Sequence, residues 1–109
     1  MKDMLEDLRK RVNDRAATDE KFAKKLAGFN KTFLVAFDDR DFYNFRIEDG
    51  KVGEIAEGNA PSDIEISVPS EVFKKIISRE IDPMSAYLEK KIKIKASLFD
   101  KLFLTELFK

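Results

Sequence analysis

The hydrophobic period of the chain changes at residue 31, and this change constrains the fold more than any other feature of the sequence. Before it, apolar residues recur every three to four positions, in the stretch 2–15 and again between Thr18 and Gly28, which is the spacing of amphipathic helices. After it, apolar and polar residues alternate, as in β-strands. The sequence therefore predicts two N-terminal helices, the second capped by Thr18 and ended by Gly28, and then a sheet.

Turn signals divide the alternating region into strands. "KTFLVAF" and "FYNFRIE" are separated by "DDRD", and "EDGK", in which Gly50 can take a positive φ, leads to a weaker strand over 52–57. The polar stretch "EGNAPSD" indicates a loop, and "DIEISV" after it alternates cleanly. Four successive strands with short connections favour an antiparallel meander that packs one face and leaves the other in water.

The C-terminal part combines helices with one more strand. A helix is expected from Pro69 or the next residue, and Asp82 and Pro83 suit the cap and the first position of a short helix. "KIKIK" at 91–95 predicts a fifth strand with its isoleucines toward the core, and a last helix is expected from about Ser97.

The last helix carries more apolar side chains than one buried face can hold. Seven of the eleven residues of "LFDKLFLTELF", at 98–108, are large and apolar. At about 100° per residue, five of them already cover about half of the circumference, and Leu104 and Phe108 fall beyond that arc. The surplus must contact another chain, a membrane surface or an apolar ligand between helix and sheet, unless it is the ordinary exposure of a terminal helix.

Composition removes several classes of function. Lys plus Arg and Asp plus Glu each number 21, so no net field draws the chain to nucleic acid. The absence of cysteine and histidine excludes disulfides, thiol or histidine-assisted catalysis, and zinc sites built from either ligand. The four glycines form no nucleotide-binding fingerprint. We therefore expect no cofactor, no metal site and no nucleic acid partner.

The organisation of the chain is expected to be simple. No repeat, linker or low-complexity segment appears, which predicts one domain over residues 1–109, with a helical segment at 1–29 and a sheet region at 30–109. The N-terminus is charged and no apolar run is long enough to span a bilayer. These features predict neither a signal peptide nor a transmembrane helix, and hence a cytoplasmic protein.

Three stretches of the sequence together resemble a known family of lipid-binding domains. They are "FRIEDGKV", "SDIEISVPSEVFKKII" and "IDPMSAYLEKKIKIKASLFDKLFLTELF", in this order. From Tyr43 to Leu107, about the last two-thirds of the chain, their order and spacing are similar to those of the sterol carrier protein-2 (SCP2) family.

The chain departs from the family pattern at three places where glycine is usual. It has Glu89 and Lys90 before the Lys-Ile strand, Ala96 and Ser97 after it, and Ser78 and Arg79 after the preceding longer helix. A side chain makes a tight turn less permissive than glycine does. These substitutions are expected to alter the mouth of a tunnel without changing the fold.

The resemblance implies an α+β fold with a five-stranded, mostly antiparallel (mixed) sheet, one face of which is covered by about five helices. It implies an apolar tunnel between sheet and helices, and a non-catalytic protein that binds or transfers a fatty acyl, isoprenoid or sterol-like lipid. The short helix after Pro83 would form a wall of the tunnel. The residues expected to line it are Phe73, Ile77, Met84, Tyr87, Leu88, Leu98, Leu102, Phe103 and Leu107.

The sequence leaves two other functions open. The apolar last helix could form a homodimer or dock the chain on an enzyme as an accessory subunit, with Leu104 and Phe108 in the interface. The other hypothesis is an enzyme that uses carboxylates and Tyr87. The partners we expect are a long-chain lipid or another apolar small molecule, at most a transient contact with a membrane surface, and, in the alternative, a second copy of the chain.

Overall fold

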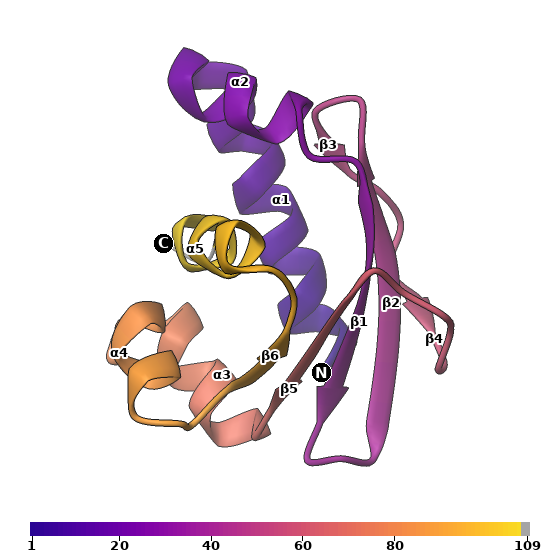
Figure 1. Cartoon of the computed structure of the whole chain (residues 1–109), viewed down its shortest axis with the longest axis vertical. Helices are drawn as coiled ribbons and strands as arrows, with labels where there is room; N and C mark the ends of the chain where they lie inside the picture. Colours follow the sequence, from indigo (N-terminus) through magenta and orange to yellow (C-terminus); the bar gives the residue numbers. More distant parts are fainter. Residues whose placement is uncertain (108–109) are drawn as a thin grey trace.

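The structure has two layers, a sheet and a set of helices that covers one of its faces (Figure 1). This computed structural model describes residues 1–107, apart from the side chain of Thr105. The helices are α1 (Lys2–Thr18), α2 (Glu20–Ala27), α3 (Ser70–Ile77), α4 (Pro83–Leu88) and α5 (Leu98–Leu107). The strands are β1 (Lys31–Phe37), β2 (Asp41–Glu48), β3 (Lys51–Val52), β4 (Ala56–Glu57), β5 (Ile64–Val68) and β6 (Lys93–Lys95). The predicted α+β class is confirmed.

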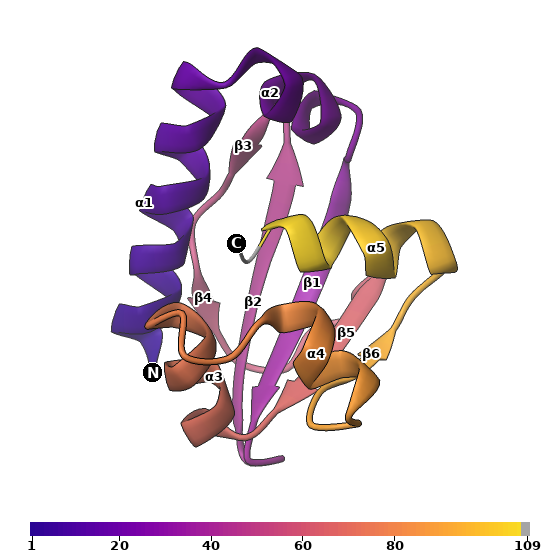
Figure 2. The ribbon, with the colours of Figure 1, turned by 90° about the vertical axis from the view of Figure 1, so that its left-hand side faces the viewer.

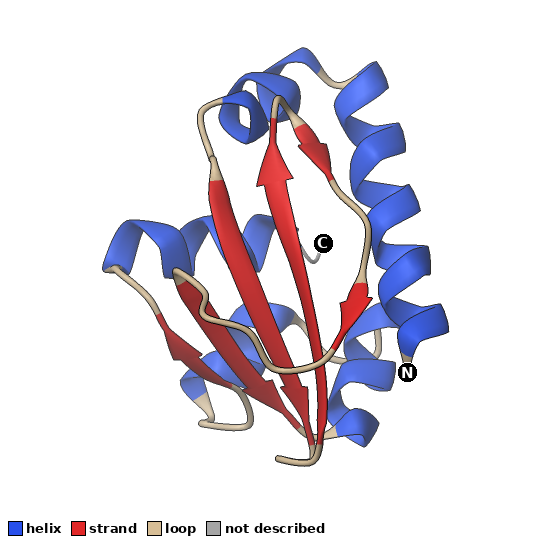
Figure 3. Cartoon of the chain, turned by 90° about the vertical axis from the view of Figure 1, so that its right-hand side faces the viewer, coloured by secondary structure: helices blue, strands red, loops and turns tan. Residues whose placement is uncertain are grey.

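The sheet is mixed, and one connection differs from the meander that the alternation favoured. Neighbouring strands follow the order β3-β2-β1-β5-β6, and β4 also pairs with β2. β5 pairs in parallel with β1 and antiparallel with β6. The loop before β5 therefore crosses β2 and β1 on the face away from the helices (Figure 3). The meander was wrong at this point because strand order depends on contacts between distant segments, which alternation does not encode.

A β-bulge explains why the weak third strand of the prediction becomes the two short strands β3 and β4. Val52 pairs with Ile47 and Ala56 pairs with Asn44, so three residues of this edge face two residues of β2. One extra residue reverses the alternation. Val52 and Ile55 consequently both point into the core, where they are 5% and 6% exposed.

The carboxylates of Asp38 and Asp63 stabilise the connections next to β1 by accepting hydrogen bonds. Asp38 and Asp39 both have positive φ, 55° and 53°, which aspartate tolerates better than most residues. The Asp38 carboxylate accepts a hydrogen bond from the backbone N–H of Ser70 (3.0 Å) at the start of α3, and this bond lowers the pKa of Asp38. Asp63 accepts hydrogen bonds from the backbone N–H and the hydroxyl of Thr32, which likewise lower its pKa.

The helix starts follow local sequence signals with one exception. Asp82 caps α4 by accepting a hydrogen bond from a backbone N–H of the first turn (3.1 Å), and Pro83 takes the first helical position, as predicted. The cap of α2 is Asp19, whose backbone is extended, and the prediction of Thr18 was wrong. Since α1 continues through Thr18, that residue is already helical and cannot adopt the extended conformation of a cap.

Helices α3 and α4 end in left-handed residues that are not glycine. Arg79 has φ 65° and Lys90 has φ 62°. After α3, the N–H of Arg79 donates to the carbonyl of Ile76 (3.1 Å). The N–H of Glu80 donates to the carbonyl of Lys75 (2.8 Å). After α4, the same two bonds measure 3.0 and 2.9 Å. This is the Schellman motif, whose left-handed position is usually glycine, and both residues belong to the places where the family resemblance leads us to expect glycine.

The core lies between the sheet and the helical layer. The inner face of the sheet contributes Phe33 and Phe37, both fully buried. The long helix α1 runs along the sheet (Figure 2) and buries Leu5, Leu8 and Val12 against it. Amphipathic spacing thus supplies the helical side of the core and strand alternation supplies the other.

Candidate functional site

The apolar layer between the sheet and the helices is the region in which the predicted ligand site falls. Two small voids interrupt this layer, each of about 10 Å³. They share the side chains of Leu5, Leu8 and Phe45, so they adjoin one another beneath α1. One water molecule needs about 10–15 Å³, and a site for a small molecule usually has several hundred. Neither of these two voids is large enough to hold a long-chain ligand as it stands.

Four of the nine predicted site residues belong to the interior side of the helical layer. Phe73 lines one of the voids and Leu107 lines the other. Ile77 is buried without lining either void. Phe103 is half-buried, and its ring stacks on that of Phe29 with centroids 4.5 Å apart. These four side chains therefore contribute to the apolar layer between the helices and the sheet.

The other five predicted residues lie at the surface of α4 and α5. Met84 and Tyr87 are half-buried on α4. Leu88, Leu98 and Leu102 are 69%, 71% and 47% exposed. The structure therefore does not place these three leucines in the interior.

Sequence reasoning missed the contribution of α1 to the interior. Leu5 and Leu8 line both voids, and Val12 lines one of them. Their spacing predicted a buried stripe, but a stripe does not say which surface covers it. Ile92, which the alternation of "KIKIK" turned inward, lines one void, whereas Ile55 at the other was hidden by the bulge.

Helix α5 closes the interior and is held at its rim by polar contacts. Its buried Asp100 forms an ion pair with Lys31 of β1. Near its other end, Lys25 Nζ of α2 lies 2.9 Å from Glu106 Oε2, and Arg15 of α1 donates to the carbonyl of Glu106 (3.1 Å). A solvent-exposed ion pair stabilises by less than about 1 kcal/mol. The outer rim contacts of α5 therefore resist displacement only weakly.

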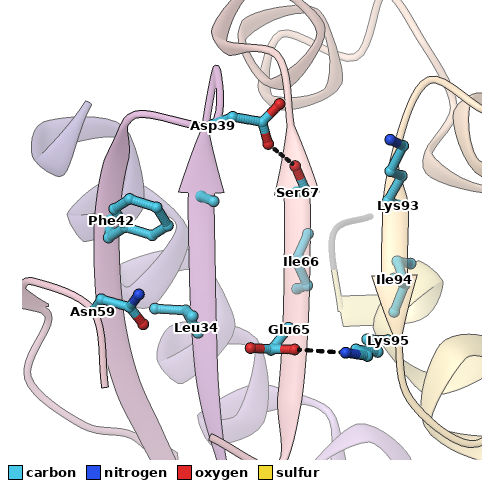
Figure 4. A pocket seen from close by; sticks show the side chains of 11 residues that line it. Leu34, Asp39, Phe42, Asn59, Glu65, Ile66, Ser67, Lys93, Ile94 and Lys95 are labelled. Atoms are coloured by element: carbon cyan, nitrogen blue, oxygen red, sulfur yellow. Dashed lines mark hydrogen bonds and ion pairs between the residues drawn. The ribbon is translucent and has the colours of Figure 1, made fainter. Parts of the chain in front are cut away.

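A second hollow, of about 410 Å³, lies on the opposite face of the sheet (Figure 4). Leu34 belongs to its floor, and Ser67 donates to Asp39 Oδ1 (2.9 Å) at one end. At the other end, Lys95 Nζ lies 3.7 Å from Glu65 Oε2. None of the nine predicted residues lines this groove. Both signs of charge surround its floor, and this mixture selects no particular class of ligand.

The described residues provide neither a metal site nor a membrane span. No group of three or more acidic side chains within residues 1–107 is arranged to hold a metal ion. None of the helices in that range is long and apolar enough to cross a bilayer.

Comparisons with known proteins agree on one fold. The model of the SCP-2 sterol transfer family matches residues 5–108. The solution structure of palmitated SCP2L2 from Aedes aegypti has a TM-score of 0.68 and 16% identity, over 93% of this chain and 90% of that one. The sterol carrier protein domain 2 of Helicoverpa armigera has a TM-score of 0.67 and 17% identity, over 94% and 83%.

A similar fold also occurs within a larger enzyme. The inverting sec-alkylsulfatase Pisa1 from Pseudomonas sp. has a TM-score of 0.62 and 19% identity over 79% of this chain, which spans only 13% of the sulfatase. Identities this low show the fold alone. No curated protein sequence matches the chain.

Proposed function

This chain belongs to the SCP-2 sterol transfer family, and from that premise we propose that it binds and carries a long-chain apolar ligand. Membership implies lipid binding or transfer in general. A fatty acyl chain is the first ligand to test, because the structure of the Aedes aegypti protein is that of a palmitated form. An isoprenoid and a sterol-like lipid are the other two ligand classes.

The observation that supports this proposal is the pair of adjoining voids beneath α1. Their walls are apolar apart from Arg9 in the second void, so an acyl chain there would leave few polar groups without water. Each methylene removed from water contributes about 0.8 kcal/mol, or roughly 8 kcal/mol for ten of them. This gain would have to offset the loss of the outer ion pair of α5, which is worth less than about 1 kcal/mol, and also the loss of the Lys31–Asp100 ion pair and of the present burial of Leu104 and Leu107.

Entry of the ligand would require α5 to move away from the sheet. Phe103 and Leu107, on the inner side of α5, would then contact the ligand instead of the side chains that they contact now. Met84 and Tyr87 of α4 would stand at the rim, where a flexible thioether and a phenol can adapt to different ligands.

A matched pair of variants tests where the ligand lies. Leu8→Phe enlarges a side chain that lines both voids, whereas Leu26→Phe makes the same change at a buried position that lines neither. We expect Leu8→Phe to lower the affinity for a fluorescent fatty acyl probe more than Leu26→Phe does, with urea unfolding used to compare folding. Equal affinities in two folded variants would place the ligand elsewhere.

Mass spectrometry of the natively purified protein, beside an organic extract of the same sample, identifies the ligand class. A discrete lipid in near-stoichiometric amount would support the carrier function. A protein that arrives empty and takes up no fatty acyl, isoprenoid or sterol probe would contradict it.

We further propose that the chain is non-catalytic and acts in the cytoplasm. Hydrolysis of an acyl thioester that is abolished by Tyr87→Phe would contradict the first statement. Cell fractionation tests the second.

The second candidate function is an interaction or accessory protein, and the exposed surface of α4 and α5 favours it. The interface cannot use Leu104 as the sequence suggested, because Leu104 is fully buried in this structure. Phe108 lies outside the described residues. A dimer mass that detergent leaves unchanged, without bound lipid, would favour this function over the carrier.

A further inference from the structure

The exposed large apolar side chains gather in one stretch of the chain. Within residues 1–107 they are Leu88 of α4 and Leu98, Phe99 and Leu102 of α5, and Phe99 is the most exposed at 84%. At about 100° per residue, the three on α5 occupy an arc of about 100°, opposite the buried Leu104. The side of α5 that carries Leu104 is thus buried, and the side that carries these three residues is exposed to water.

Helix α4 and the start of α5 lie on the same side of the molecule. β6 joins them through the edge of the sheet, and Lys101 Nζ of α5 is 5.6 Å from the centre of the Tyr87 ring of α4. Figure 2 shows α4, β6 and the first turn of α5 together on the right of the molecule. The α4–α5 surface is defined here by Leu88, Leu98, Phe99 and Leu102.

The same stretch is basic within a chain of no net charge. Residues 88–102 contain five lysines and two acidic residues, a net charge of +3, whereas the formal net charge of the whole chain is +0. One of the two acids, Asp100, is buried and paired with Lys31 of β1. Lys90 and Lys91, which follow α4, are exposed, and Lys101 lies over the ring of Tyr87, whereas Lys93 and Lys95 line the groove on the opposite face of the sheet. Positive charge therefore faces water next to the α4–α5 surface.

We propose that the α4–α5 surface docks on an anionic lipid bilayer. Exposed leucine and phenylalanine beside lysines match the boundary between headgroups and acyl chains, where apolar side chains insert and cations meet anionic lipid. A second copy of the chain would bring two basic stretches face to face, which disfavours self-association through this surface. The inference rests on the carrier function for its purpose, since a carrier must meet the membrane that supplies its ligand.

Sedimentation with vesicles tests the docking surface. The protein as purified is mixed with vesicles of phosphatidylcholine alone, or of phosphatidylcholine and phosphatidylglycerol in equal parts. We expect stronger binding to the anionic vesicles, weakened by salt. Phe99→Ser, at an exposed position, is expected to lower the affinity by about tenfold. Lys91→Gln is expected to lower it by about fivefold, and Lys24→Gln on α2, which removes an equal charge, to leave it unchanged.

Each contrary result has a distinct meaning. Equal binding by the native chain and Phe99→Ser, or equal binding to both kinds of vesicle, would overturn the docking proposal. A dimer that Phe99→Ser converts to a monomer, without vesicle binding, would assign the surface to self-association and overturn it as well. Probe titration in the absence of vesicles tests the carrier function by itself, so failure of one proposal is distinguishable from failure of the other.

Discussion

Replacement of Arg79 by glycine is expected to stabilise the protein. Arg79 follows α3 in the left-handed region, with φ 65°, and this conformation costs an L-residue roughly 1–2 kcal/mol. The two hydrogen bonds of the motif, from the N–H groups of Arg79 and Glu80, go to backbone carbonyls. Glycine keeps both bonds, and the Arg79 side chain that it removes is exposed.

The magnitude follows from two opposing terms. Removal of the left-handed strain contributes roughly 1–2 kcal/mol, and the greater freedom of glycine in the unfolded chain takes back roughly 0.5–1 kcal/mol. The net gain in the free energy of unfolding is about 0.5–1 kcal/mol. In a domain of about this size that corresponds to a rise in Tm of roughly 2–8 °C.

Urea unfolding followed by circular dichroism measures the effect, with an unchanged slope expected if only stability changes. The matched control is Lys74→Gly, at an exposed interior position of α3, where glycine lacks the benefit and costs about 1 kcal/mol. The two variants should therefore shift the midpoint in opposite directions. If Arg79→Gly lowers the midpoint as Lys74→Gly does, the assignment of strain to this helix end is refuted.

Three further predictions concern other contacts. Lys90→Gly, at the left-handed end of α4, should raise the urea midpoint, whereas Lys91→Gly, which removes the same charge, should not. The pKa of Asp63 is lowered in the folded state, so the stability from its hydrogen bonds is present above about pH 4 and is lost as the pH falls through the lowered pKa. The free energy of unfolding of Asp63→Asn should therefore depend less on pH in that range than that of the native chain. Lys31→Ala leaves buried Asp100 without its ion-pair partner and should cost roughly 1–3 kcal/mol in thermal unfolding, most of which Lys31→Leu combined with Asp100→Leu should recover.

Local rules predicted most elements because their causes are local. Asp82 caps α4 and Pro83 takes its first position because of their own side-chain chemistry, and Gly50 takes its positive φ (73°) in the predicted turn. The bulge between Val52 and Ile55 was not predictable in this way, because the sequence shows only a broken alternation. Strand order was equally hidden, since the parallel pairing of β5 with β1 joins segments about thirty residues apart.

The candidate site was predictable only in part. The apolar surplus of the last helix is plain in the sequence, but Leu98 and Leu104 are the same residue type, and only the packing decides that the first is exposed and the second buried. The stripe of Leu5 and Leu8 was visible too, although its partner surface was not. Periodicity identifies an apolar face, whereas its occupant depends on tertiary contacts.

Helix α5 links the two proposals, because one arc covers the interior and the other forms most of the docking surface. If bound ligand displaces α5, the exposure of Leu98 and Phe99 changes, and with it the affinity for a bilayer. Thermodynamic linkage then requires that vesicles change the affinity for ligand by the same factor as ligand changes the affinity for vesicles. Vesicle sedimentation with and without the fatty acyl probe, and probe titration with and without vesicles, measure the two factors. Equal factors different from one would show that docking and loading are coupled through α5, whereas two factors of one would mean that α5 presents the same surface in both states.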